Sequence, residues 1–296
     1  MMEERPMRET IYPDLEKQLN RNMDAAGALV VPARSAYHTS LEPADLFVMV
    51  FCNRSEIHGC VASYMVGHWR VKEIWMQFSR LTADILAGEE PWTVHWLLDG
   101  DVLYDPDHRV RQLCSFVRRF PEDLRRKKSC VEFSRLLRYY MESKNYLKEG
   151  FNLDAYVSVQ HTLQYWARLV VIDAGDYPRV QLWRQVQPLN TGVYKLYKEL
   201  VDGRETVEQR SRLVLLAAEY SILSRMEHYC RYVLDLLGSG AGVWTVKELH
   251  DRLQLEQMNL DLTLLLEELV KRSYIEEVVF MEEEVGEQRY RLAPKE

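Results

Sequence analysis

The sequence predicts a chain in three parts: a small α+β domain, an antiparallel helical bundle and a C-terminal winged helix. Three observations carry this prediction. Short apolar runs, rich in β-branched and aromatic residues, recur between residues 28 and 104, as buried strands do. From residue 107 the apolar residues recur with a helical period instead. After the glycines at 238, 240 and 242 the order becomes helix, helix, hairpin, which is the pattern of a winged helix. The predicted domains are residues 1–118, 119–238 and 239–296.

The composition describes an ordinary globular protein. The 296 residues are 47% hydrophobic and 28% charged, and the formal net charge is −7. A chain of this length can form two or three domains, and its acidity argues against a nucleic-acid coat. Five scattered cysteines without a C-x-x-C pair predict neither a zinc site nor a disulfide framework. The polar N-terminus and the lack of any apolar run near roughly 20 residues predict no signal peptide and no membrane span. We therefore expect a cytoplasmic protein.

In the first domain we expect a short helix over residues 15–22, six strands, and helical segments between the strands. The most distinct of these segments covers residues 78–87 and is closed by Gly88, as a C-cap glycine does. Asp99-Gly100-Asp101 is interpreted as a hairpin turn, because Asp-Gly suits a positive φ. Asp105 precedes a helix and is interpreted as its N-cap. The predicted strands cover residues 28–31, 45–52, 60–66, 69–76, 92–98 and 101–104.

The second domain is predicted to consist of long amphipathic helices with short connections, which pack as an antiparallel bundle. Pro121 ends the first of these helices, and Thr206 caps the longest. The predicted helices are residues 109–120, a second ending at Gly150, 153–174, 193–201 and 206–237. The C-terminal part is predicted to contain helices over 244–253 and from 259 or 261 to 272, then strands over 274–280 and 288–292.

This order of parts, together with several short sequences, resembles a bacterial family called nucleotidyltransferase-like proteins. The resembling sequences are Phe133-Ser134-Arg135-Leu136-Leu137-Arg138-Tyr139-Tyr140, Asp154-Ala155-Tyr156, residues 167–172, Trp183 and residues 193–200. The resemblance covers most of the chain. It implies that the α+β domain has a mixed sheet and a reduced polymerase-β-type nucleotidyltransferase fold, and that the bundle is a substrate-binding-like domain. It also suggests that the bundle faces an N-terminal cleft, where Trp166 and Arg168 would complete a pocket.

Active members of the wider superfamily carry a Gly-Ser turn that grips the nucleotide phosphates, a strand with two acids at i and i+2, and a third acid on a neighbouring strand. Alternate strand residues point the same way, so the two acids can bind the same pair of Mg²⁺ ions. These ions neutralise the triphosphate and align the attacking hydroxyl. The resemblance therefore makes Asp45, at the start of the second predicted strand, the candidate for the first acid.

The sequence departs from this pattern at each step. Gly27 is followed by alanine, Asp45 has Phe47 at its i+2 position, and the third strand is expected to present His95. A neutral imidazole is a poor Mg²⁺ ligand. We therefore predict a nucleotidyltransferase-like fold without standard two-metal chemistry, no metal ligands, and Mg²⁺ as cofactor only if activity survives. Asp45 and His95 remain the catalytic candidates; alternatively Asp45 caps its strand, and His95 is a partly buried histidine beside Trp92 and Trp96.

A basic segment stands out in this acidic chain. Residues 109–138 hold ten Lys or Arg and three acidic residues. Such a cluster can attract the phosphates of a nucleotide or an RNA, and Arg125, Arg126, Lys127 and Lys128 are the candidate phosphate-binding residues. Alternatively, the segment is a solvated helix face.

The leading functional hypothesis is a protein that retains a nucleotide-binding, ligand-binding or regulatory role, with the substrate left open. One alternative is an active nucleotidyltransferase with Asp45 and atypical ligands such as Glu73 and His95. Another is an RNA- or DNA-binding regulator that uses residues 109–138. Residues 239–296 hold seven basic and thirteen acidic residues, so this part is poorly suited to bind duplex DNA. We expect it to have a structural role or to dock a protein partner.

Overall fold

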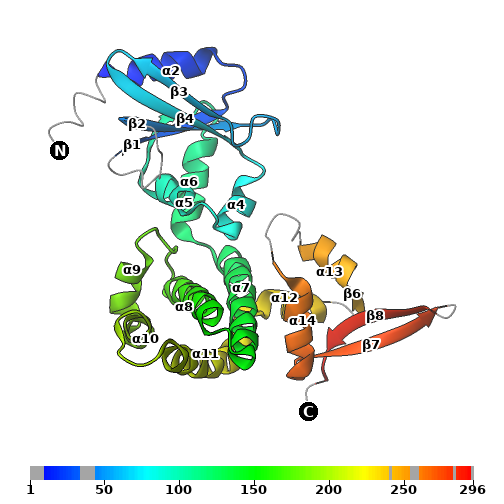
Figure 1. Ribbon diagram of the computed structural model, residues 1–296. Helices are drawn as coiled ribbons and strands as arrows, with labels where there is room; N and C mark the ends of the chain where they lie inside the picture. The colour runs from blue at the N-terminus through cyan, green and yellow to red at the C-terminus, as the bar shows by residue number, and fades with distance from the viewer. Residues whose placement is uncertain (1–9, 34–43, 240–241, 254–259, 283–284, 295–296) are drawn as a thin grey trace. The chain divides into compact units, whose positions relative to one another are not determined.

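The computed structural model describes residues 10–33, 44–239, 242–253, 260–282 and 285–294, without the side chains of residues 91, 223, 280–282 and 285–287. The chain divides into two compact units, residues 1–121 and 122–296 (Figure 1). This division separates two units, and the three domains predicted from the sequence stay a prediction. Each unit is described separately below.

The first unit contains a five-stranded mixed sheet with the strand order β3-β4-β2-β1-β5. The pair β2–β4 is parallel, and the other three pairs are antiparallel. Every residue of β2 is buried, as its unbroken apolar sequence predicts. The sheet thus has the mixed character that the resemblance implies. Its strands are β1 (Gly27–Pro32), β2 (Leu46–Cys52), β3 (Val61–Val66), β4 (Trp69–Gln77) and β5 (Asp101–Tyr104).

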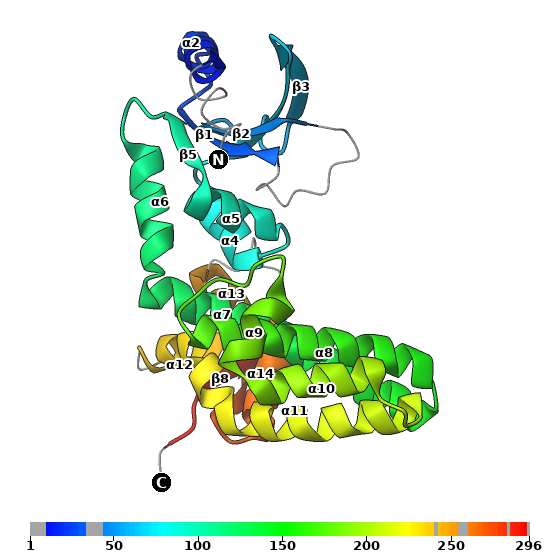
Figure 2. The same cartoon turned by 90° about the vertical axis from the view of Figure 1, so that its left-hand side faces the viewer.

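Helices cover both faces of this sheet (Figures 1 and 2). On one face, α2 (Tyr12–Arg21) packs against Val30, Val48 and Val50. The alternate residues of β2 face the other way: the Phe47 ring lies 5.3 Å from that of Trp96, and the Phe51 ring lies 4.9 Å from that of Phe78. The helices that follow the sheet strands are α4 (Leu81–Ala87), α5 (Pro91–Asp99) and α6 (Arg109–Arg119).

The strand predicted over residues 92–98 is wrong, because this segment is the helix α5. Its side chains are buried nearly all round, so the sequence shows no helical period and a short apolar run of this kind is ambiguous. The proline at the first helical position was the available signal, since Pro favours that position. His95 therefore lies on a helix that covers the sheet, and no strand carries a third acid there.

Two local predictions around this helix have different outcomes. The hairpin turn predicted at Asp99-Gly100-Asp101 is wrong: Gly100 has φ −73° and closes α5. Glycine is required there by space, because a Cβ would lie 2.5 Å from the Trp96 carbonyl oxygen. The cap predicted for Asp105 is right in part: the N-cap position of α6 is His108, but the Asp105 carboxylate accepts hydrogen bonds from the backbone N–H groups of Val110 and Arg111 at 2.9 and 3.1 Å.

The second unit is built on two long antiparallel helices, α7 (Glu122–Glu149) and α8 (Asn152–Asp173). Gly150 has φ +82° and makes the turn between them. The bundle continues through α9 (Leu182–Leu189), α10 (Thr191–Asp202) and α11 (Val207–Tyr229). Thr206 and Gln209 form the capping box at the start of α11.

The single helix predicted over residues 206–237 is wrong, because two helices occupy this segment. The helix α11 ends at Tyr229, and a separate helix, α12 (Arg231–Gly238), follows Cys230. Neither glycine nor proline occurs at this junction, so the hydrophobic period runs through the break and gives no sign of it. The junction matters because side chains from both helices line the same cavity.

The C-terminal part contains the predicted order helix, helix, hairpin, but Trp244 and Thr245, predicted to open the first helix, form a short strand before it. It runs through β6 (Trp244–Thr245), α13 (Val246–Leu253), α14 (Leu262–Lys271), β7 (Ile275–Glu282) and β8 (Val285–Leu292). The strands form a sheet with the order β6-β8-β7. Asp261 caps α14 and pairs with Arg138 of α7 at 3.0 Å. The winged-helix class of this part stays a prediction. Across the described ranges, none of the helices combines the length and apolarity needed to cross a membrane.

Candidate functional site

Asp45, the first candidate acid, holds the start of two paired strands. Its Oδ2 accepts a hydrogen bond from the backbone N–H of Arg70 at 2.8 Å, and its own N–H donates to the Arg70 carbonyl at 2.9 Å. The side chain thus closes the open end of the β2–β4 ladder. This is the strand-capping alternative considered for Asp45.

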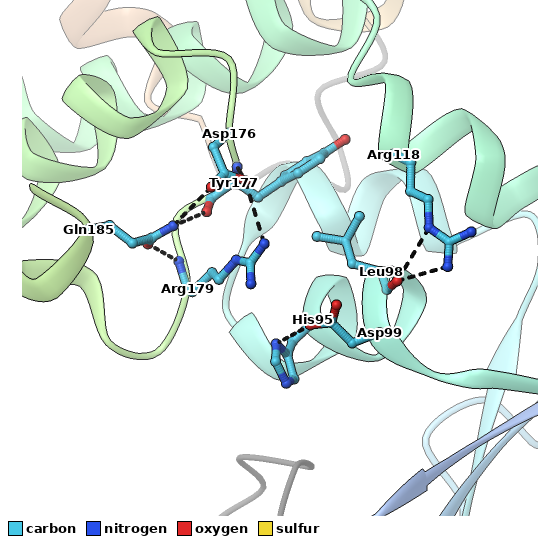
Figure 3. A network of polar contacts seen from close by, with 8 residues as sticks. All are labelled: His95, Leu98, Asp99, Arg118, Asp176, Tyr177, Arg179 and Gln185. Carbon is cyan, nitrogen blue, oxygen red and sulfur yellow. Dashed lines mark hydrogen bonds and ion pairs between the residues drawn. The ribbon is translucent and has the colours of Figure 1, made fainter. Parts of the chain in front are cut away.

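Glu73 and His95, the atypical ligands considered together with Asp45, lie on opposite faces of the sheet. Glu73 shares the face of α2, where its carboxylate accepts from the Tyr64 hydroxyl at 2.8 Å and from the Trp75 indole at 2.7 Å. His95 lies on α5, across the sheet, and its Nδ1 is 3.2 Å from Asp99 Oδ2 (Figure 3). Because the sheet separates Glu73 from His95, they cannot complete one metal site with Asp45.

The residues of the first unit do not fit the pair of Mg²⁺ ions that the fold family uses. Phe47 occupies the position of the second acid, and a helix replaces the strand of the third. Within the described ranges, no three His, Cys, Asp or Glu side chains are grouped so that they could hold a metal ion. Gly27 has a packing role, because a Cβ there would lie 2.4 Å from Val110 Cγ2.

The four consecutive basic residues on α7 point in different directions, because neighbouring residues on a helix differ by about 100°. Arg125 and Arg126 line a cavity in the second unit. Lys127 Nζ lies 5.2 Å from the centroid of the Tyr232 ring. Lys128 is only 2% exposed and pairs with Glu132 at 3.2 Å. Two of the four predicted phosphate-binding residues therefore share a site.

Lys128 belongs to a buried charge cluster between α7 and α8. Glu132 is fully buried, and Arg168 contacts both of its carboxylate oxygens at 2.7 Å. Burial lowers the pKa of Lys128 to about 8. Burial alone would raise the pKa of Glu132, but the charges of Arg168 and Lys128 outweigh it and lower that pKa. Arg168 thus has a structural partner, and this cluster joins α7 to α8.

The cavity beside this cluster has a volume of about 610 Å³, within the usual size of small-molecule sites. It lies entirely in the second unit, and side chains of α7, α8, α11 and α12 line it. Three arginines and a histidine face three carboxylates there. The lining residues are Glu122, Arg125, Arg126, Ser129, Asp173, Ser224, Glu227, His228 and Arg231.

The arginines of this cavity differ in how they are held. Arg126 pairs with Glu122 and, at 3.3 Å, with Asp235. Arg231 pairs with Asp235 at 3.3 Å and with Glu227 at 3.4 Å. Arg125 forms no ion pair with any residue that the structure describes; a Cβ built on Gly175, at the end of α8, would lie 3.6 Å from its Nη1. Arg125 therefore offers an uncompensated guanidinium to the cavity.

Asp173, at the end of α8, forms one wall of the cavity. Its Oδ2 accepts from Arg225 Nη1 and from the Tyr229 hydroxyl, both at 2.8 Å. Its Oδ1 lies 3.3 Å from His228 Nε2. Arg225 compensates the charge of this carboxylate, so Asp173 does little to repel an anion held by the other arginines.

Comparison with known proteins finds a family model for each of two consecutive segments of the chain. The family model described as nucleotidyltransferase-like matches residues 7–125, and the one described as YgxA-like substrate binding domain matches residues 126–225. The uncharacterized protein YgxA of Bacillus subtilis (strain 168) is 32% identical over 197 residues, 67% of each chain. The chain belongs to the YgxA-like family of nucleotidyltransferase-like proteins.

A solved structure shows the same fold. The crystal structure of a nucleotidyltransferase-like protein from Exiguobacterium sibiricum 255-15 has a TM-score of 0.82 to this chain. It is 24% identical, and the match covers 97% of this chain and 98% of that one. Four of the nine residues that line the cavity, Arg126, Ser129, Asp173 and Ser224, lie within the segment that matches the model of the substrate binding domain.

The loop after α8 is fixed by one glutamine. Gln185 Nε2 donates to Asp176 Oδ2 at 3.3 Å and to the Tyr177 carbonyl at 3.0 Å, while its Oε1 accepts from the Arg179 N–H at 2.8 Å (Figure 3). These bonds hold the segment that follows Asp173 and Gly175, and hence one border of the cavity.

The sequence identified only part of this site. Arg125 and Arg126 stood out because they lie in a dense basic segment. Asp173, His228 and Arg231 did not, because each is a single polar residue on an amphipathic helix and the solvent-facing side of any such helix carries similar residues. Only the packing of α7, α8, α11 and α12 brings them together.

Proposed function

We propose that this YgxA-like protein binds a small anionic ligand, a nucleotide or another phosphorylated molecule, in the cavity of its helical domain. The observation that carries the proposal is the convergence of Arg125, Arg126 and Arg231 on one cavity, with Arg125 uncompensated within the described chain. A guanidinium carries five donors in a planar fork, so the paired arginines retain donors for a phosphate group as well. The ion pairs of Arg126 and Arg231 orient them in advance.

We further propose that the protein does not perform standard two-metal nucleotidyl transfer. Two observations in the first acid strand support this proposal: the Asp45 carboxylate accepts a hydrogen bond from the Arg70 backbone N–H, and Phe47 is apolar. In addition, the sheet separates Glu73 from His95. Mg²⁺ requires several oxygen ligands around one point. The alternative of an active enzyme with atypical ligands would need these groups to converge.

Nucleic-acid binding by residues 109–138 receives less support. Several of these basic side chains are used internally: Arg118 donates to the Leu98 carbonyl at 2.8 Å, Arg138 pairs with Asp261, and Lys128 is buried (Figure 3). We assign residues 239–296 to the winged-helix class from the order of their elements, and their acidic balance favours a protein partner over a duplex.

A binding experiment tests the ligand proposal. The full-length protein is titrated with sodium tripolyphosphate in a calorimeter at low ionic strength. We expect binding that weakens at least tenfold in Arg125→Gln, because the uncompensated guanidinium is lost. Lys148→Gln is the matched control: it removes the same charge from the same helix, ~35 Å along its axis at 1.5 Å per residue, and should bind like the wild type. No binding, or equal weakening in both variants, contradicts the proposal.

A second experiment tests the catalytic statement. The protein is incubated with α-labelled nucleoside triphosphates, Mg²⁺ or Mn²⁺, and a pool of RNA and small molecules. We expect no transfer of label to any acceptor. Transfer that disappears in Asp45→Asn would show that the enzyme is active, and the proposal of lost two-metal chemistry would then be wrong.

A further inference from the structure

The short helix α12 contributes to the anion cavity although it lies beyond the segment that matches the substrate binding model. Its first residue, Arg231, lines the cavity. One turn later, the carboxylate of Asp235 joins two of the cavity arginines: Oδ2 lies 3.3 Å from Arg126 Nη1, and Oδ1 lies 3.3 Å from Arg231 Nε. Asp235 itself is not one of the described residues that line the cavity, so it acts on a ligand only through these arginines.

The two ion pairs of Asp235 contribute geometry rather than stability. All three side chains are about half-exposed, and ion pairs of this kind add little to the free energy of folding. A carboxylate beside an anion site also repels the anion. What Asp235 supplies is the orientation of two guanidinium groups from different helices, which lowers the entropy that they lose when they bind one ligand.

The same helix supports the C-terminal sheet. It contacts both α7 and β8 (Figure 1). Val233 and Leu237 of α12 are buried, and a Cβ built on Gly238 would lie 2.9 Å from Leu292 Cδ1 of β8. A movement of α12 that displaces Asp235 from Arg126 therefore also disturbs the packing of β8.

Resting on the proposed function, we infer that Asp235 is a positioning residue of the anion site and that α12 couples this site to the C-terminal sheet. The ligand binds when α12 is docked on α7, because only then are Arg126 and Arg231 held together by one carboxylate. Binding thus stabilises the docked helix and the packing of β8 on it. The coupling is reciprocal: a change that stabilises β8 on α12 also tightens binding of the ligand.

The first test uses the direction of an effect. Asp235→Asn removes a negative charge beside the site, so electrostatics alone predicts tighter binding of sodium tripolyphosphate. The amide has one acceptor oxygen and turns N–H donors toward the second guanidinium, so loss of positioning predicts calorimetric affinity that is weaker by roughly threefold or more. Asp235→Glu keeps the carboxylate and should bind more tightly than Asp235→Asn. The control Asp202→Asn removes the same charge at the exposed end of α10 and should bind like the wild type.

The second test needs only the wild type, so it does not depend on the folding of a variant. Amide hydrogen exchange is measured with and without tripolyphosphate at about ten times its Kd. Amides that exchange when α12 leaves α7 should then exchange up to about tenfold more slowly. We expect this effect in α12 and at residues 288–292 of β8. Amides that open locally in α10, which supplies none of the described residues lining the cavity, should keep their rates.

The outcomes distinguish this inference from the proposed function. A smaller weakening in Asp235→Asn, or tighter binding, would overturn the positioning role. Binding without slower exchange in β8 would overturn the coupling, even where α12 itself is protected. Either result leaves anion binding by the cavity standing. Absence of tripolyphosphate binding by the wild type would overturn both the inference and the proposed function.

Discussion

The hydroxyl of Tyr229 donates a 2.8 Å hydrogen bond to Oδ2 of Asp173 and thereby joins the end of α11 to the end of α8. Tyr229 is almost completely buried. Burial, together with the charge of Asp173, raises the pKa of Tyr229, so the phenol keeps its proton and remains a donor at neutral pH. This bond fixes the carboxylate that forms one wall of the cavity.

Replacing Tyr229 by phenylalanine should lower the free energy of unfolding by about 1.5–3 kcal/mol, the usual contribution of a hydrogen bond to a charged group. Urea denaturation monitored by circular dichroism measures the change. Tyr220→Phe on the same helix removes an exposed hydroxyl and should alter stability by only a few tenths of a kcal/mol. Equal effects of the two substitutions would contradict a structural role for the Asp173 bond.

Glu132→Gln should be among the most destabilising substitutions in the second unit. It removes the only negative charge of the buried cluster and leaves Lys128 and Arg168 facing each other without it. Loss of one partner from a buried ion pair costs about 3–5 kcal/mol. Chemical denaturation checks this. The control Glu149→Gln, at the exposed end of the same helix, should be close to neutral, and a similarly small loss for Glu132→Gln would be inconsistent with the cluster.

Lys128 makes stability depend on pH in a defined direction. Its pKa is about 8 in the folded protein against 10.5 for an ordinary lysine. Between these values the unfolded chain binds a proton that the folded chain does not, so this group favours folding increasingly as pH rises. The free energy of unfolding of the wild type, minus that of Lys128→Met, should rise by about 3 kcal/mol over this interval. Denaturation of both proteins at several pH values measures it; a constant or falling difference would contradict the assignment.

Asp45 should respond to substitution as a structural acceptor. Asp45→Asn keeps an oxygen for the Arg70 N–H and should change stability by less than about 0.5 kcal/mol. Asp45→Ala removes the acceptor and should cost about 1 kcal/mol. Thermal unfolding of both variants distinguishes them. If Asn proved as damaging as Ala, the negative charge itself would be required, contrary to a capping role.

The sequence predicted those elements whose signals are local. Val48 and its neighbours form an unbroken apolar run that only a buried strand explains well, and Gly88 and Gly150 mark helix ends by the left-handed backbone that they adopt. Residues 92–98 were misassigned because a short helix buried on every side has no amphipathic period. The break at Cys230 was missed because no residue type signals it.

The candidate site could be predicted only as far as charge density reveals it. Arg125 is conspicuous in the sequence, whereas Asp173 and His228 lie 48 and 103 residues further along. Their meeting depends on the packing of three helices, and one sequence carries no record of such long-range contacts. The same holds for Lys128, whose burial against Glu132 cannot be distinguished from exposure by its place in a basic run.

The contact between Phe47 and Trp96 limits how the protein could change its chemistry during evolution. Phe47 is 4% exposed, and its ring packs against an indole that is fully buried. Substitution of Phe47 by aspartate would place an unsolvated carboxylate against that indole and leave a void around it. Gaining a second acid at this position therefore requires coordinated replacements in β2 and α5 rather than one substitution.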